Sequence, residues 1–484
     1  MRDLLVIYVN GARHEVSGRW AERTLTEWLR EGLRLVGTKV VCSEGDCGAC
    51  SVLVGRVEAP GEALVYRTID ACIAFLYQLD RCHVVTVEGL RQGAVLSPVQ
   101  RAMVDCHGSQ CGFCTPGFVT TLHGMLEAQN GDPLTDEGLR YGLSGNLCRC
   151  TGYAQIIEAG RSIDPARVAR IAELYDSKRI ATDLAAIGTE DVCIEITEAG
   201  ATRRVMIPTS LSKAIAWKAE FPAARLVSGA TDLGVQRNHG KLPAGDVLYL
   251  GRVAGFDKIA HQAGALTMAA GATWRQVEQA TRTLLPQLWA ILTRFGSPQI
   301  RNLATFGGNL ANASPIADSL PALYAQGAEL ELASARGRRR VPIESFYLGY
   351  KQLDLAADEL IVAVHMPLPA EHNELVLAKV SKRRDMDIST VASAVWLTVE
   401  EGTIVDARVA LGGVGPTVVR SPGAEGVLVG AGVEEETFRK AGRAARADVT
   451  PISDVRSSAA YRAQLVENLV ARAFFEIAPQ PVGA

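Results

Sequence analysis

Four cysteines in the N-terminal part of the sequence limit most strongly what this chain can fold into. Three of them, Cys42, Cys47 and Cys50, lie within nine residues, and Cys72 follows at a distance. This C-x4-C-x2-C…C spacing is typical of a plant-type 2Fe-2S site. Zinc also takes four thiolates, but zinc sites usually combine two short pairs, whereas three ligands lie on one loop here. The spacing therefore predicts an iron–sulfur loop.

A second set of four cysteines lies further along the chain. Cys111 and Cys114 form a C-x2-C pair just ahead of Pro116, and Cys148 and Cys150 form a C-x-C pair. Taken alone, this pattern fits zinc as well as an iron–sulfur cluster. The total of eleven cysteines is odd, which argues against a simple disulfide framework. The remaining thiols are expected to be small, buried hydrophobic side chains: Cys82, Cys106 and Cys193.

Length and composition indicate a globular chain with several domains. At roughly 150 residues per domain, 484 residues correspond to about three units. Hydrophobic residues make up 48% and charged residues 21%, which is ordinary for domains that bury a core. The net charge of -3 gives no basic excess, so neither nucleic acid nor an anionic membrane surface is expected as a partner.

No export or membrane segment is expected at the N-terminus. Residues 4–9 are apolar, but this run follows Asp3 and is too short for a signal sequence or a membrane span. It is better explained as a strand. The sequence therefore predicts a cytoplasmic protein, in which clustered thiols serve metals more often than disulfides.

The N-terminal part of the chain predicts a small mixed sheet. β-branched runs at residues 4–9, 51–54 and 84–87 are separated by turn residues. Between them, Thr24 precedes a helical stretch with Glu27 at its third position, which is a capping box. We therefore expect one short helix to cross the sheet.

From about residue 91 the pattern becomes helical. Residues 97–104 and 116–126 carry apolar residues at helical spacing. Proline is tolerated in the first turn of a helix, so Pro116 predicts that Cys114 lies at a helix start. The second cysteine set should therefore be held at helix ends.

The second half of the chain alternates strand-like and helix-like segments that are rich in glycine. After a connector at residues 164–203, this pattern leads to strands at residues 376–380 and 391–399. The chain closes on an amphipathic helix at residues 458–470. The sequence has no Walker loop and no strand–turn–helix with G-x-G-x-x-G, so a Rossmann nucleotide site is not expected.

Three long motifs resemble the molybdenum hydroxylase (xanthine oxidase) family, and the likeness covers nearly the whole chain. Residues 36–50 (VGTKVVCSEGDCGAC) resemble the ferredoxin loop of the family. Residues 110–118 (QCGFCTPGF) and 145–153 (GNLCRCTGY) resemble its helical cluster domain. The chain is similar to the iron–sulfur and FAD subunit of the purine-hydroxylating dehydrogenases in this family.

The resemblance implies an α+β multidomain fold. It implies a β-grasp 2Fe-2S ferredoxin domain at residues 1–90 and a helical-bundle 2Fe-2S domain at residues 91–163. After the connector at residues 164–203, it implies a two-subdomain α+β FAD-binding domain at 204–372 and a C-terminal α+β domain at 373–484.

The resemblance also implies two 2Fe-2S clusters, and FAD bound without a Rossmann motif. Residues 226–233 correspond to a segment that cradles the pyrophosphate through backbone N–H groups, and Phe295 takes the place of a ring that stacks on the isoalloxazine. The expected cluster ligands are Cys42, Cys47, Cys50 and Cys72, then Cys111, Cys114, Cys148 and Cys150. The expected FAD contacts are Leu226, Val227, Ser228, Gly229, Ala230, Thr231, Asp232, Leu233, Phe295, Thr305, Gly308, Asn309, Asp318, Ile361 and Lys379.

A charged loop at residues 382–388 (KRRDMDI) resembles the place beside the flavin where a nicotinamide dinucleotide approaches. The resemblance implies NAD+ as the electron acceptor. Without it, such a charge run would be a solvated surface turn. Met386 departs from the acidic residue that the purine-hydroxylating members of the family carry there, so both NAD+ and oxygen are retained as acceptors.

The resemblance places the substrate site on another chain. A molybdopterin site needs several hundred further residues, and this chain ends at Ala484. We therefore expect an electron-transfer subunit, without catalytic residues for hydroxylation, in a heterotetramer with a molybdopterin-binding large subunit. The implied substrates are hypoxanthine and xanthine. The alternatives are the equivalent subunit for an aldehyde, carbon monoxide or an aromatic thioester, and a zinc-stabilised assembly module without redox activity.

Overall fold

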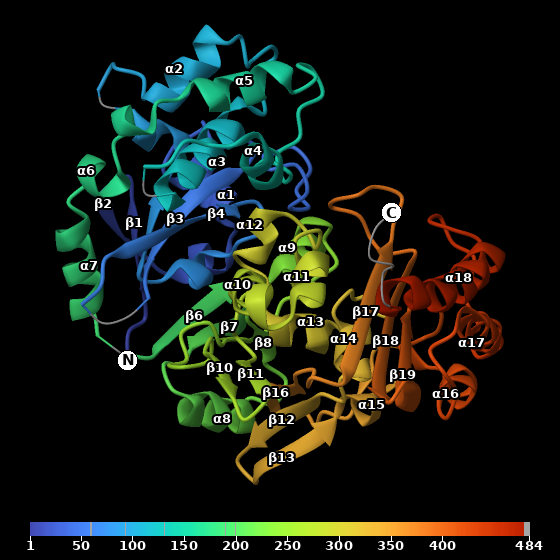
Figure 1. Ribbon diagram of the computed structural model, residues 1–484. Helices are drawn as coiled ribbons and strands as arrows, with labels where there is room; N and C mark the ends of the chain where they lie inside the picture. Colours follow the sequence, from blue (N-terminus) through green and yellow to red (C-terminus); the bar gives the residue numbers. More distant parts are fainter. Residues whose placement is uncertain (59–60, 92, 130, 189, 199, 479–484) are drawn as a thin grey trace. The chain divides into compact units, whose positions relative to one another are not determined.

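The computed structural model describes residues 1–58, 61–91, 93–129, 131–188, 190–198 and 200–478 (Figure 1). The chain forms two compact units. The first consists of Met1–Ala254 and Gly296–Ala304, and the second of Gly255–Phe295 and Thr305–Ala484. Within the described residues, no helix is both long and apolar enough to cross a bilayer.

The first unit begins with a mixed five-stranded sheet in the order β2-β1-β5-β3-β4. β1 and β5 run parallel, whereas the other neighbouring pairs are antiparallel. Asn10 and Gly11 connect β1 to β2 with φ angles of 48° and 82°, as a tight hairpin requires. The predicted mixed sheet is confirmed. Its strands are β1 (Leu5–Val9), β2 (Ala12–Val16), β3 (Ser51–Val57), β4 (Leu64–Asp70) and β5 (Cys82–Val85).

The helix of this domain is short and begins at Thr24. The Thr24 hydroxyl accepts the Glu27 N–H, and the Glu27 carboxylate accepts the Thr24 N–H, around α1 (Leu25–Glu27). The predicted capping box is therefore confirmed. The chain continues through one π-helical turn, η2 (Trp28–Gly32), which leads into the cysteine loop.

Helices α2 to α5 form the second domain, and α2 and α3 confirm the two helices that the apolar spacing predicted. α3 packs closely on β3 and β4 at Gly124, where a Cβ would lie 2.6 Å from Thr68 Oγ1 and 2.7 Å from Leu53 Cδ2. The helices and the sheet therefore share one core. The helices are α2 (Pro98–Asp105), α3 (Thr115–Ala128), α4 (Asp136–Gly142) and α5 (Ala154–Ser162).

Residues 164–203, which we expected to form a connector, contain regular structure. The 3-10 turn η5 (Pro165–Arg167) is followed by α6 (Ile171–Leu174), α7 (Ser177–Ala186) and β6 (Val192–Glu198). In β6, Val192, Ile194 and Ile196 are buried and the residues between them are more exposed. An alternation over only three buried positions is too short to stand out in a sequence.

A four-stranded sheet in the order β6-β7-β9-β8 completes the first unit. β7, β9 and β8 run parallel, so their carboxyl ends lie at one edge, where β8 leads into α9. The elements are β7 (Ala201–Ile207), α8 (Leu211–Glu220), β8 (Arg225–Val227), α9 (Thr231–Asn238) and β9 (Val247–Tyr249).

The second unit contains an antiparallel sheet in the order β10-β11-β16-β12-β13 and several helices. Its strands are β10 (Ile259–Gln262), β11 (Ala265–Ala269), β12 (Glu329–Ser334), β13 (Gly337–Pro342) and β16 (Leu360–Pro367), with the hairpin β14 (Tyr347–Gly349) and β15 (Gln352–Leu353). Its helices are α10 (Trp274–Leu284), α11 (Pro286–Leu292), α13 (Phe306–Asn312), α14 (Leu320–Ala325) and α15 (Ile343–Phe346).

The C-terminal sheet of the second unit has the order β17-β18-β19-β20, and helices α16 to α18 pack on it (Figure 1). The predicted closing helix is confirmed as α18, capped by Ser458. The elements are β17 (Asn373–Val380), β18 (Val391–Glu400), β19 (Thr403–Gly412), β20 (Val419–Arg420), α16 (Pro422–Leu428), α17 (Glu435–Ala447) and α18 (Ala459–Ile477).

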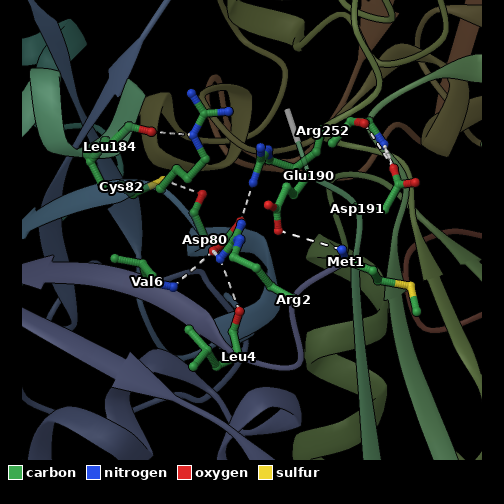
Figure 2. Close-up of polar contacts among 12 residues, drawn as sticks. Met1, Arg2, Leu4, Val6, Asp80, Cys82, Leu184, Glu190, Asp191 and Arg252 are labelled. Carbon is green, nitrogen blue, oxygen red and sulfur yellow. Dashed lines mark hydrogen bonds and ion pairs between the residues drawn. The ribbon is translucent and has the colours of Figure 1, made fainter. Parts of the chain in front are cut away.

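A buried ion network connects three segments of the first unit (Figure 2). Asp80 follows the turn η3 (Leu76–Leu79), and its side chain has no exposed surface. Its Oδ1 accepts Val6 N–H at 2.9 Å, and its Oδ2 accepts Arg2 Nη2 at 2.8 Å. Arg252, which follows β9, also pairs with Oδ2. One carboxylate therefore joins the ferredoxin sheet to the neighbouring four-stranded sheet.

Candidate iron–sulfur and flavin sites

The first cysteine set lies on the loop before β3 and just after β4. Hydrogen bonds with Cys47 and then Cys72 lower the pKa of Cys42, and a hydrogen bond with Cys72 lowers the pKa of Cys50. Each thiol therefore contacts at least one other thiol of the set. Cys47, Cys50 and Cys72 are buried, and Cys42 is half-buried. The structure brings together all four side chains that we predict to hold the first cluster.

The loop of this set bends so that backbone N–H groups face sulfur. Glu44 N–H donates to Cys42 Sγ at 3.4 Å. Gly45 and Gly48 have φ angles of 74° and 63°, and a Cβ at Gly45 would come within 2.6 Å of Ile73 Cδ1. Glycine is needed here for the bend, and the bend supplies donors of the kind that stabilise cluster sulfur.

Asp70 is a neighbour of the first set that the sequence did not single out. Its side chain is buried at the end of β4, and its Oδ1 lies 3.6 Å from Cys50 Sγ. Burial, and then the negative charge of Cys50, raise the pKa of Asp70. One local indication of this contact was present in the sequence, because Asp70 lies two positions before Cys72, at the end of a strand-like run.

Of the second cysteine set, only Cys114 lies at a helix end as predicted; Cys111, Cys148 and Cys150 lie in the loops between helices. Cys114 caps α3, as Pro116 predicted. Burial, together with a hydrogen bond to Cys148, raises the pKa of Cys114 to about 12. Cys111 and Cys150 are exposed, and their sulfur atoms lie 3.5 Å apart. The four thiols therefore form two contacting pairs, an arrangement that fits a four-thiolate site.

Thr151 and Tyr153 hold the loop of Cys148 and were also missed by the sequence. Thr151 N–H and its hydroxyl donate to Cys148 Sγ at 3.5 and 3.1 Å. These bonds outweigh burial, so the pKa of Cys148 is lowered. Cys148 N–H donates to Tyr153 OH at 3.0 Å, and Tyr153 adopts the left-handed φ of 72° before α5. The loop thus presents Cys148 with its thiolate form favoured.

The three remaining cysteines differ from the expectation that all are buried. Cys82 is buried, but Cys106 and Cys193 are half-buried. Cys106 lies near the end of α2, where its Sγ is 3.6 Å from Ser162 Oγ, and Cys193 lies on β6 between two buried positions. Among the described residues, no three His, Cys, Asp or Glu side chains meet at the spacing of a single-ion site.

The loops of the two cysteine sets are hydrogen-bonded to each other. Leu147 N–H, directly before Cys148, donates to Cys47 O at 2.9 Å. Asn146 Nδ2 donates to Gly48 O at 3.1 Å. A Cβ at Gly48 would lie only 2.4 Å from Gly145 O, so the two backbones touch at this point. A single hydrogen bond therefore connects Cys47 of the first set to Leu147, the residue directly before Cys148 of the second set.

Helix α9 connects the first set to the segment that we predict to cradle pyrophosphate. Asn238, at the end of α9, donates through Nδ2 to Ser43 O at 2.8 Å and to Cys72 O at 2.9 Å. Gly234 has no room for a side chain, because a Cβ would lie 2.4 Å from Ile73 O. The same short helix therefore begins at the predicted flavin segment and ends on the first cysteine set.

The predicted pyrophosphate segment, residues 226–233, runs from β8 into the first turn of α9. Gln78 Nε2 donates to Ser228 O at 3.2 Å and to Gly229 O at 3.1 Å, which fixes the turn. Ala230 has a left-handed φ of 57°. Ser228 Oγ is buried without a hydrogen-bond partner among the described residues, as expected of a group that a ligand completes. The segment fits a phosphate ligand at a helix N-terminus.

The other predicted flavin contacts belong to the second unit. Phe295 lies beside Trp274, with ring centroids 4.9 Å apart, and Trp274 also meets Phe306 edge-on at 5.1 Å. Trp274 is buried, so its packing against the Phe295 ring holds that ring in place. The sequence singled out Phe295 but gave no signal for Trp274. Ile361 is buried on β16 opposite Leu332.

Polar residues of the predicted flavin site are held by local bonds. Thr305 caps α13, where its Oγ1 accepts Gly308 N–H at 3.2 Å. Asn309 Oδ1 accepts the Ser319 hydroxyl at 2.9 Å. Asp318 and Lys379 pair at 2.6 Å with almost no exposed surface. The Ser389 hydroxyl also donates to Asp318, so this pair is fixed by a residue that the sequence did not indicate.

The charged loop at residues 382–388 is a compact turn. Arg383 N–H donates to Asp387 Oδ2 at 2.8 Å, and the Arg383 guanidinium donates to Met386 O at 2.8 Å. Met386 takes a left-handed φ of 51° at the tip. Burial acts to raise the pKa of Asp387, but the Arg383 bond and charge outweigh it, so the pKa is lowered.

Four family descriptions match successive parts of the chain. They are "2Fe-2S iron-sulfur cluster binding domain" at residues 7–76 and "[2Fe-2S] binding domain" at 86–161. The others are "FAD binding domain in molybdopterin dehydrogenase" at 199–369 and "CO dehydrogenase flavoprotein C-terminal domain" at 377–477. The chain thus carries two 2Fe-2S domains followed by an FAD-binding domain.

Individual proteins show the same likeness. Xanthine dehydrogenase 2 of Arabidopsis thaliana is 30% identical over 490 residues, covering 88% of this chain and 36% of that protein. The chain thus spans about a third of the length of this curated relative. Carbon monoxide dehydrogenase of Hydrogenophaga pseudoflava has a TM-score of 0.53 at 26% identity, covering 55% of this chain and 94% of that one. Quinoline 2-oxidoreductase of Pseudomonas putida 86 has a TM-score of 0.52 at 29% identity, and the match covers 57% of this chain and 95% of that one.

Two iron–sulfur domains joined to an FAD-binding domain define an iron–sulfur flavoprotein of the oxidoreductase class. Such a protein exchanges electrons through bound cofactors. The chain belongs to the molybdenum hydroxylase (xanthine oxidase) family, of which it carries the iron–sulfur and FAD part.

Proposed function

We propose that this chain is the electron-transfer part of an NAD-dependent xanthine dehydrogenase. It would connect the hydroxylation of hypoxanthine and xanthine on a molybdopterin-bearing partner subunit with the reduction of NAD+. The hydrogen bond from Leu147 N–H to Cys47 O carries the electron-transfer part of the proposal, because it joins the two cysteine loops directly, and the likeness to a xanthine dehydrogenase favours xanthine as the substrate. When bound, the clusters supply one-electron chemistry and the flavin links it to two-electron chemistry.

The residues of the chain have distinct tasks in this proposal. Cys42, Cys47, Cys50 and Cys72 would hold one cluster, and Cys111, Cys114, Cys148 and Cys150 the other. Glu44 N–H and the Thr151 hydroxyl favour the thiolate forms that bind iron. Asn238 positions the start of the first set against α9, and Ser228 and the following N–H groups would bind the flavin phosphates.

The exposure of the second set supports a partner docking there. Cys111 and Cys150 are exposed, and they are bordered by Phe113, Leu147 and Tyr153, whose exposed fractions are 51%, 44% and 39%. An apolar rim around a redox site suits contact with another subunit. We propose that the molybdopterin-binding large subunit covers this surface, in a heterotetramer of two small and two large subunits.

The proposed NAD+ site rests on the positive charge of one loop. The loop at residues 382–388 carries Lys382, Arg383 and Arg384, which can attract the phosphates of NAD+. The buried Asp318–Lys379 pair holds β17, the strand that leads into this loop. We propose that the protein works in the cytoplasm, where its eleven unpaired cysteines remain reduced.

Substitution of one ligand should remove one cluster and leave the other. In Cys114→Ser, we expect loss of one of the two paramagnetic signals of the reduced protein and of about half of its iron, since each cluster needs four thiolates. Low-temperature paramagnetic resonance and iron analysis measure both. Cys106→Ser makes the same change outside the two sets and should keep both signals. Retention of both signals in Cys114→Ser would contradict the ligand assignment.

The proposed reaction is tested on the complex isolated with its natural partner. A tag on this chain should recover a molybdenum-containing subunit, and the complex should reduce NAD+ with xanthine. Family members matched in structure include a carbon monoxide dehydrogenase and a quinoline oxidoreductase, so a second candidate is the same role for a different substrate. Activity with carbon monoxide, an aldehyde, a thioester or an N-heterocycle, but not xanthine, would favour that candidate. A colourless zinc protein would exclude both.

A further inference from the structure

A short segment of the chain leaves the second unit and belongs to the first. Gly296–Ala304 is part of the first unit, whereas the residues on both sides of it belong to the second. It contains α12 (Pro298–Arg301), capped by Ser297, whose Oγ accepts Ile300 N–H at 3.1 Å. Ser297, Gln299 and Arg301 are almost completely buried. Polar side chains so deeply buried on one turn of helix are costly unless they have defined partners.

Gln299 reaches the junction between the two cysteine loops. Its Nε2 donates to Asn146 Oδ1 at 2.9 Å and lies 3.4 Å from Ser51 Oγ and 3.5 Å from Thr121 Oγ1. Asn146 in turn donates to Gly48 O. Ser51 directly follows a cysteine of the first set, and Asn146 lies two residues before a cysteine of the second. One amide group therefore contacts both loops.

The neighbours of Gln299 also hold both cluster domains. Arg301 Nη2 donates to Tyr141 OH at 2.8 Å, and the guanidinium lies 5.2 Å from the centre of the Tyr141 ring, on α4 of the helical domain. Asn302 Nδ2 donates to Thr68 O at 2.8 Å, on β4 of the ferredoxin domain. A Cβ at Gly145 would lie 2.1 Å from Gln299 Oε1, so this contact leaves no free space.

We propose that α12 sets the distance between the two clusters, with Gln299 as the central positioning residue. The rate of electron transfer falls steeply with distance, so a fixed junction between the cysteine loops keeps this step fast. The inference rests on the proposed function, because it takes the two cysteine sets as cluster ligands. Gln299 itself is neither a predicted ligand nor a predicted flavin contact, and acts through Asn146 and Ser51.

The full chain with its cofactors tests the inference in Gln299→Met. Methionine has nearly the same length and fills the same space but cannot donate to Asn146. In the fully reduced protein, the magnetic coupling between the two clusters falls with the third power of their distance. We expect both cluster signals to remain in this variant, and the splitting caused by their coupling to decrease. Paramagnetic resonance of the reduced protein measures the splitting without any substrate.

Gln326→Met is the matched control, because Gln326 is an equally buried glutamine that lies in the second unit. It should leave the splitting unchanged. If Gln299→Met does not fold, Gln299→Asn keeps the amide but shortens it, and should also reduce the splitting. An unchanged splitting with both signals present would overturn the positioning role. Absence of two cluster signals in the wild-type protein would instead overturn the proposed function.

Discussion

Asp80→Asn is expected to lower the free energy of unfolding of the first unit by about 3–5 kcal/mol, the usual cost of removing one partner from a buried ion pair. Asp80 has no exposed side-chain surface, and the exposed fractions of Arg2 and Arg252 are only 13% and 9%. Burial already lowers the pKa of Arg252, so the Asp80 charge is what offsets the cost of keeping it charged. Asparagine would fit the space but would turn an NH2 group toward one of the donors.

Denaturant unfolding of the wild-type and variant chains measures this change. Asp136→Asn is the matched control, because Asp136 also pairs with an arginine, Arg161, but both side chains are about half exposed. Exposed pairs contribute little to stability, so the control should unfold like the wild type. An equal response of the two variants would mean that the Asp80 network (Figure 2) does not stabilise the junction between the two sheets.

Features that depend on neighbouring residues in the sequence were predictable. The C-x4-C-x2-C spacing placed three thiols on one loop, and Pro116 placed Cys114 at a helix start. Thr24 and Glu27 formed the capping box that their spacing indicated. In each case a few residues of local backbone determine the geometry, so a sequence pattern is sufficient.

Features that depend on distant pairs were not predictable. Asn238 bonds to Cys72 O, and Gln299 bonds to Asn146, across separations of 166 and 153 residues. Neither side chain belongs to a local motif with a defined partner. The strand β6 was missed for a related reason, because its pairing with β7 and not its own short pattern defines it. Tertiary packing therefore decided the parts of the site that join one domain to another.

The stability of the first unit should also fall as the pH falls from about 6.5 to 4, because it buries two neutral histidines. Burial lowers the pKa of His83 to about 4, and burial together with Arg170 lowers the pKa of His123 to about 4. His83 Nε2 accepts Gly11 N–H at 3.1 Å, a bond that only the neutral ring can make. Neither ring nitrogen of His123 has a hydrogen-bond partner among the described residues.

The direction of this pH dependence follows from the difference in proton binding between the unfolded and the folded chain. Unfolded histidine titrates near pH 6.5, so between pH 6.5 and 4 the unfolded chain binds protons that the folded chain excludes. The contribution of the two neutral histidines to stability is fully present above pH 6.5 and is lost as the pH falls, by about 3 kcal/mol for each histidine at pH 4.

His123→Leu should remove about half of this dependence, and it should not weaken the protein at pH 7, since it replaces a buried imidazole that lacks partners. Denaturant unfolding at pH 7 and pH 5 measures both effects. His261→Leu, at an exposed position on β10, should keep the wild-type pH dependence. The same dependence in His123→Leu as in the wild type would show that His123 does not exclude the proton, and the loss of stability in acid would then have to come from His83 and the carboxylates.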